Sequence, residues 1–141
     1  MSTLIEDALA AKLADYLTAN RPEEIPDAVS IHVANRDELR TRPCIVLATS
    51  DAKPVTGLRH TARIKLDVHL FSQVDDTPAD DHAAWAAALA GILRGVGEIQ
   101  AAVDTDTFCL HALLPRESAT TPDESRGRET IISFEAVVSA V

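Results

Sequence analysis

The fold is decided by the stretch Arg63-Ile64-Lys65-Leu66-Asp67-Val68-His69-Leu70-Phe71. Aliphatic side chains occupy every even position, and charged or polar side chains occupy the odd positions up to 69. This two-residue period is that of a β-strand, because successive side chains of a strand point to opposite faces of the sheet. We therefore expect a long strand with one face buried in a core and the other face carrying charge.

Four other segments also indicate strands. Residues 29–33 alternate as Val-Ser-Ile-His-Val, and residues 44–48 are continuously apolar, which is typical of a central strand. Residues 108–114 alternate up to Pro115, where we expect the strand to end because proline cannot donate to a sheet ladder. The last alternating segment is 130–141.

Two segments have a helical period. Residues 3–20 place apolar side chains on one face, as an amphipathic helix does. Residues 79–94 follow a Thr-Pro pair that favours a helix start, and their alanines allow close packing on a sheet. We expect Gly95 and Gly97 to end this second helix.

The resulting order is helix, three strands, helix, two strands, with hairpin-length connections after the second and fourth strands. It predicts an α+β fold, with a mainly antiparallel sheet of about five strands and two helices packed on one face. The polar segment 116–128 is expected to be a mobile hairpin loop. The chain length of 141 residues and the 46% of hydrophobic residues suit one domain, 1–141.

Composition excludes several classes of function. The formal charge of −9 has the wrong sign for holding a phosphate backbone, so tight nucleic-acid binding is disfavoured. Cys44 and Cys109 lie among apolar neighbours, as buried cysteines do, and do not indicate a disulfide framework. No apolar run approaches the eighteen or so residues of a membrane span, and no secretion signal is visible, so we expect cytosolic synthesis without membrane attachment.

The sequence offers little catalytic chemistry. Asp67 and His69 could supply two metal ligands, but a structural zinc site needs about four and a catalytic one three. The HExxH, CxxC and GxSxG patterns do not occur, and the glycines at 91, 95 and 97 do not follow a strand as phosphate-binding glycines would. We therefore expect no enzyme, no metal and no cofactor.

Two charged stretches, 35–42 and 116–128, mix both signs. They can be solvated loops, or they can form complementary salt bridges with neighbouring subunits. In the second case the candidate interface residues are Arg36, Asp37, Glu38, Arg40, Arg42, Arg116, Glu117, Asp123, Glu124, Arg126 and Arg128.

The order of elements resembles a known family. The chain has an N-terminal helix, a strand, the Arg42-Pro43-Cys44-Ile45-Val46-Leu47 segment, the long alternating strand ending in Phe71, a helix and a closing pair of strands. In this arrangement the chain resembles the tail terminator, or tail-completion, proteins of long-tailed bacteriophages. Related head-tail joining and neck proteins share a similar plan.

The resemblance implies a structural virion protein that acts by assembly. Such a subunit forms a ring, six-fold by expectation, at the head-proximal end of the tail, ends tail-tube polymerisation and joins the tail to the head connector. Its partners would be its own copies, the tail tube protein and the connector or neck proteins. DNA would cross the acidic lumen without specific binding. The protein would be assembled in the host cytoplasm and reside in the virion tail or neck.

Other functions remain open at this level. The chain can be another head-tail joining or neck protein, or an accessory subunit of a cellular complex. It can also be a small cytosolic ligand-binding module, in which Lys65, Asp67, His69 and His111 line a pocket on the charged face of the sheet.

Overall fold

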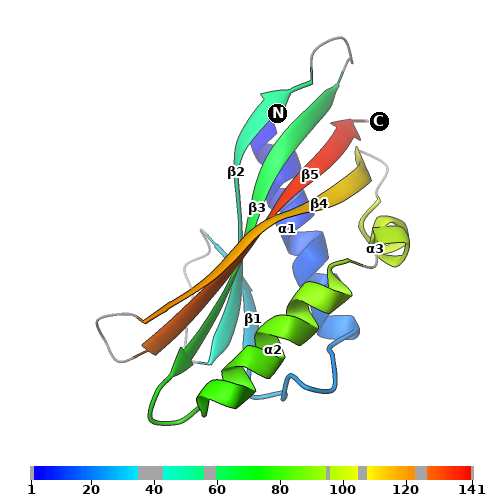
Figure 1. The fold of residues 1–141 in the computed structure, drawn as a ribbon. Coiled ribbons are helices and arrows are strands. Elements are labelled where there is room, and N and C mark those ends of the chain that lie inside the picture. Colours follow the sequence, from blue (N-terminus) through cyan, green and yellow to red (C-terminus); the bar gives the residue numbers. More distant parts are fainter. Residues whose placement is uncertain are drawn as a thin grey trace.

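The computed structural model describes residues 2–34, 43–55, 60–94, 96–104, 108–122 and 127–140. The chain has an α+β fold, as expected from the sequence (Figure 1). Its elements are, in order, α1 (Ser2–Ala19), β1 (Ser30–Val33), β2 (Cys44–Pro54), β3 (Thr61–Gln73), α2 (Ala79–Ile92), α3 (Val96–Val103), β4 (Phe108–Pro122) and β5 (Gly127–Ala140).

The strands form one five-stranded sheet in the order β1-β2-β3-β5-β4. Neighbouring strands are antiparallel, apart from β1 and β2, which run parallel. The prediction of a mainly antiparallel sheet is thus confirmed. The strand around 63–71 has β2 on one side and β5 on the other, so the stretch that decides the fold lies at the centre of the sheet.

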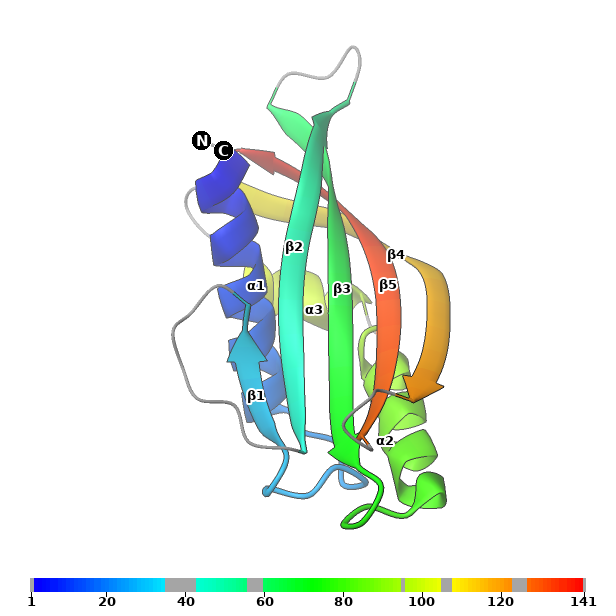
Figure 2. The same cartoon turned by 90° about the vertical axis from the view of Figure 1, so that its left-hand side faces the viewer.

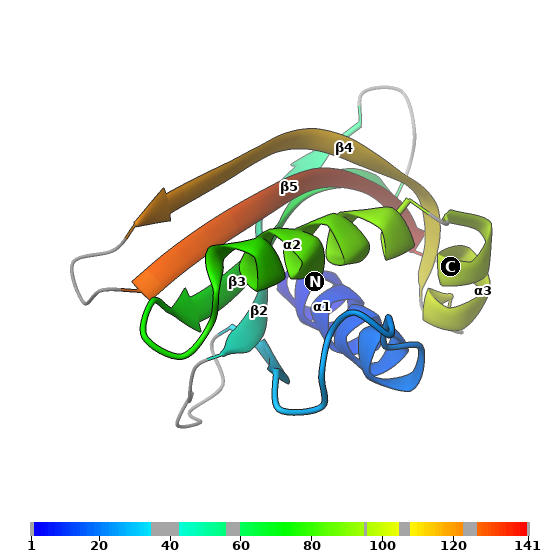
Figure 3. The same ribbon diagram turned by 60° about the horizontal axis from the view of Figure 1, so that its bottom comes forward.

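The helices cover one face of the sheet, and the core lies between the two layers. Figure 3 shows the sheet arched over the helices, and Figure 2 shows the opposite, helix-free face. The even positions of β3, from Ile64 to Leu70, are almost completely buried. They pack in one hydrophobic cluster with Leu9, Leu13 and Leu17 of α1, Leu89 of α2, and Ile132, Phe134, Ala136 and Val138 of β5.

The prediction of a hairpin loop at 116–128 is wrong. β4 continues through Pro115 to Pro122, and β5 begins at Gly127, so most of this polar segment is paired strand. Proline is tolerated because β4 is an edge strand, and its register with β5 shifts between Pro115 and Ser118. The composition is polar because much of the extended hairpin lies in contact with solvent.

The second helical segment also differs from expectation. α2 ends at Ile92. Gly97 does not end a helix, because it lies inside a further helix, α3. Gly95 lies outside the described residues. Ile99 and Val103 of α3 are fully buried and lie four residues apart, on one face of the helix. The sheet is therefore covered by α3 in addition to the two expected helices.

Candidate functional site

The helix-free face of the sheet gathers the charged side chains of the central strands. Arg63, Lys65, Asp67 and His69 all lie on this face, because they alternate with the buried positions of β3. The register with β5 sets Lys65 opposite Glu135 and Asp67 opposite Ser133. The Ser133 hydroxyl donates a hydrogen bond of 2.7 Å to Asp67 Oδ1. The two strands therefore place two polar pairs side by side at the middle of this face.

The carboxylate of Glu135 lies between two arginines. Arg116 Nη2 of β4 donates a 2.8 Å hydrogen bond to Glu135 Oε2, and Arg63 Nε of β3 lies 3.5 Å from Oε1. Lys65 Nζ lies 3.9 Å from Asp67 Oδ2. Each carboxylate oxygen of Glu135 thus faces one guanidinium group, and strands β3, β5 and β4 are tied together on this side.

These side chains surround an open depression of about 530 Å³. We call it the basic hollow; its lining residues are Lys53, Arg63, Lys65, Arg116, Ser133, Phe134 and Glu135. Among the side chains that the structure describes, four cationic ones and one carboxylate line it, which sum to a charge of +3 in a chain whose formal charge is −9. Half of the eight lysines and arginines that the structure describes are gathered here. The hollow therefore attracts negative charge.

The alternating segments 63–71 and 130–141 predict on which face of its strand each of Arg63, Lys65 and Glu135 lies, but they could not bring the three together. Alternation gives the face on which a side chain lies, whereas the pairing of β3 with β5 is set by the whole sheet. Lys53 lies between the predicted strands 44–48 and 63–71, in a segment rich in turn-forming residues, so no strand pattern pointed to it. In the structure, β2 extends to Pro54 and pairs Lys53 with Arg63.

The pocket of the alternative ligand-binding function, lined by Lys65, Asp67, His69 and His111, is not assembled. His69 pairs with Ile131 and stacks on Phe71, with ring centroids 5.9 Å apart. His111 contacts Ser139, eight residues farther along β5 than Ile131, or about 26 Å at 3.3 Å per residue. The two histidines therefore cannot contact one small ligand together.

The predicted interface residues divide into three groups. Arg116 lines the basic hollow, and Arg128 donates from Nη1 to the Thr77 carbonyl at 2.6 Å. Glu117 lies within β4, but its side chain is outside the described part of the structure. Also outside it are Arg36, Asp37, Glu38, Arg40, Arg42, Asp123, Glu124 and Arg126.

A buried polar network lies on the helix-covered side. His82 of α2 is hydrogen-bonded through Nδ1 to Ser72 Oγ and through Nε2 to Thr130 Oγ1, both at 2.7 Å. Thr130 Oγ1 also lies 2.6 Å from Thr120 Oγ1. Burial lowers the pKa of the His82 imidazole, and the Arg128 guanidinium lowers it further. His82 is only 2% exposed, so no substrate reaches this Ser-His pair, and the network anchors α2 to β3 and β5.

The described residues contain no group of three His, Cys, Asp or Glu side chains arranged to hold a metal ion. Neither cysteine is part of a disulfide in the described part of the chain; Cys44 is buried, and Cys109 is partly exposed near His111 and Ser139. Among the helices that the structure describes, none is by itself long and apolar enough to cross a bilayer.

The sequence matches no protein-family model, and no curated protein sequence is significantly similar to it. The fold, however, has counterparts among solved structures. One is a chain from the virion of a native gene transfer agent particle, with a TM-score of 0.62, 14% identity and coverage of 94% of this chain and 97% of that one. Another solved chain has a TM-score of 0.50 and 10% identity, with 100% and 96% coverage. At these identities, what the chain shares with both is its fold.

Proposed function

We propose that this protein is a structural virion subunit. In this proposal it forms a ring, six-fold by expectation, at the head-proximal end of a phage-like tail, where it ends polymerisation of the tail tube and joins the tail to the head connector. It acts by assembly, not by catalysis, and its partners are its own copies, the tail tube protein and the connector. The observation that carries the proposal is the fold shared, over 94% of the chain, with a chain from a gene transfer agent virion.

The surface of the molecule supports an assembly role. Rings require two different, mutually complementary patches on each subunit. The strands β1 and β4 leave two different edges at the two sides of the sheet, and the helix-free face carries the basic hollow. A formal charge of −9 per subunit would also let DNA cross the lumen of such a ring without adhering.

The test is native mass spectrometry of the purified protein over a concentration series, with electron microscopy of any large species, alone and mixed with tail tubes of the cognate virus. We expect closed rings, or density that caps one end of the tubes, because a repeating tube end raises the effective concentration of weakly associating subunits. Tubes that stay uncapped while the protein remains monomeric or dimeric would contradict the proposal. Binding to isolated connectors but not to tubes would favour a head-tail joining role.

A further inference from the structure

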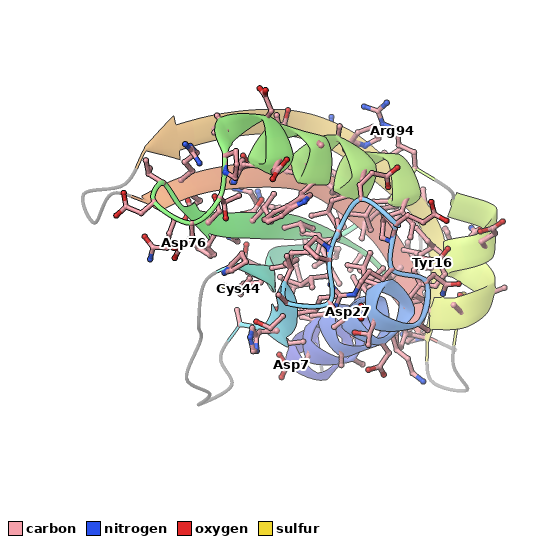
Figure 4. The ribbon with its side chains drawn as sticks, turned by 90° about the horizontal axis from the view of Figure 1, so that it is seen from below. Asp7, Tyr16, Asp27, Cys44, Asp76 and Arg94 are labelled. Atoms are coloured by element: carbon pink, nitrogen blue, oxygen red, sulfur yellow. The ribbon has the colours of Figure 1, made fainter. Side chains whose placement is uncertain are left out.

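A strongly acidic turn follows the last residue of β3, away from the basic hollow. It comprises residues 75–81, the sequence Asp-Asp-Thr-Pro-Ala-Asp-Asp, between β3 and α2. All four of its aspartates are exposed. Figure 4 shows Asp76 at the rim of the molecule. The turn therefore presents four carboxylates within seven residues.

The acidic turn has a defined shape. The backbone N–H groups of Asp76 and Thr77 donate to the Gln73 carbonyl at 3.2 and 2.9 Å. Arg128 holds the Thr77 carbonyl, and the Thr77 side chain is buried. A surface that is already ordered loses less conformational entropy when it docks than a flexible loop does.

The acidic turn cannot reach the basic hollow of its own chain. Lys65 lies in the first half of β3 and the turn follows its last residue, Gln73, about 26 Å away at 3.3 Å per residue (Figure 2). The two patches are opposite in charge; the hollow lies along the first half of β3, and the turn follows the last residue of the same strand. Two neighbouring copies of the chain can therefore satisfy both patches, one copy at the hollow and the other at the turn.

Resting on the proposed function, we propose that the basic hollow receives the acidic turn of a neighbouring copy. Lys53, Arg63, Lys65 and Arg116 face the aspartates of the neighbour, while Glu135 keeps the two arginines oriented. The contact joins different surfaces of the two copies and so repeats from subunit to subunit, as a ring requires. It also offsets the repulsion between subunits that each carry a charge of −9.

Two charge-reversed variants test the contact. The hollow variant is Lys53→Glu/Arg63→Glu/Lys65→Glu, which keeps the Arg116–Glu135 pair, and the turn variant is Asp76→Lys/Asp80→Lys/Asp81→Lys. Either variant alone should need about tenfold or more protein for half-maximal assembly, because like charges then face one another. An equimolar mixture should assemble again with strictly alternating subunits, since each hollow then meets a turn of opposite charge. Native mass spectra with one variant 15N-labelled should then show equal numbers of the two variants in each assembly, as alternation requires.

The controls separate folding from docking. Lys12→Glu, at an exposed site of α1, should assemble as the wild type does. The neutral variants Lys53→Gln/Arg63→Gln/Lys65→Gln and Asp76→Asn/Asp80→Asn/Asp81→Asn cover the case in which a reversed variant does not fold, and each should weaken assembly less than full reversal. Circular dichroism reports folding of every variant.

Failure of the contact is distinguishable from failure of the proposed function. Reversed variants that assemble as well as the wild type overturn the contact and leave the ring intact. Wild-type filaments or dimers that depend on both patches support the contact and contradict ring closure. Wild-type protein that stays monomeric throughout overturns the contact. Binding of a short DNA duplex that is lost in the hollow variant, with self-assembly unchanged, also overturns it, because the hollow would then hold nucleic acid.

Discussion

His82 sits where a single proton affects the packing of α2. A neutral imidazole has one donor and one acceptor nitrogen, and the hydroxyl groups of Ser72 and Thr130 can complement either tautomer. A protonated ring would bring a charge into a 2% exposed site close to Arg128. The folded protein therefore favours the neutral ring.

We expect stability to depend on pH through His82. Its pKa is lowered in the folded protein, so between that pKa and the ordinary value of about 6.5 the unfolded chain binds the proton and the folded chain does not. The free energy of unfolding should fall as the pH drops below about 6.5, by up to about 1.4 kcal/mol per pH unit for one proton. Urea titrations between pH 7.5 and 5.5 measure it.

Two substitutions isolate this effect. His82→Gln should lose that part of the pH dependence, because the titrating group is gone. Ser72→Ala should reduce stability by about 1 kcal/mol at every pH yet keep the slope, because it removes a hydrogen bond and leaves the imidazole buried. A His82→Gln protein with the wild-type slope would show that another group is responsible.

Among the elements, β3 and α1 were the most predictable from the sequence, because each has a long, regular apolar period. The expected helix 3–20 agrees with α1, Ser2–Ala19, within one residue at each end. The predicted strand ended too early, at Pro115, because proline usually marks the end of a strand. Only the order of strands in the sheet shows that β4 is an edge strand, where proline is tolerated. A proline is therefore informative about a strand only once the position of that strand in the sheet is known.

The short helix α3 was missed for a different reason. Its apolar signal is brief, and Gly97 in its first turn reads as the end of the preceding helix. The basic hollow could not be predicted from the sequence, because its residues come from four strands and no local pattern encodes the register between those strands. The periodicity of the sequence was therefore enough to predict the layers of the fold. The candidate site depends on long-range strand pairing, which only the structure shows.

Despite its eight residues, α3 should contribute substantially to stability. Ile99→Ala removes a fully buried side chain that packs in the hydrophobic cluster with α1 and β4, and it should lower the free energy of unfolding by about 2–4 kcal/mol. Ala102→Ser, on the exposed side of α3, should change it by less than about 0.5 kcal/mol. Equal effects of the two changes in denaturant titrations would mean that α3 is not docked in solution.

For the whole molecule, the distribution of charge predicts how association responds to salt. Contacts between a hollow whose described lining side chains sum to +3 and a turn with four aspartates are screened as ionic strength rises. Self-association should weaken when NaCl is raised from about 0.05 to about 0.5 M, where the Debye length falls from about 14 to about 4 Å. Sedimentation velocity measures it; association that strengthens with salt would indicate that apolar contacts dominate.

The order of the strands also constrains how the chain folds. β3 pairs with β2 across a short connection, but its other edge pairs with β5, whose residues follow 54 to 78 positions later in the chain. On the ribosome, the edge of β3 that faces β5 stays open until β5 has emerged. During that interval β3, whose even positions are all apolar from Ile64 to Leu70, can pair with a strand of another nascent chain. Aggregation during synthesis is thus favoured by the same topology that places the decisive strand at the centre of the folded sheet.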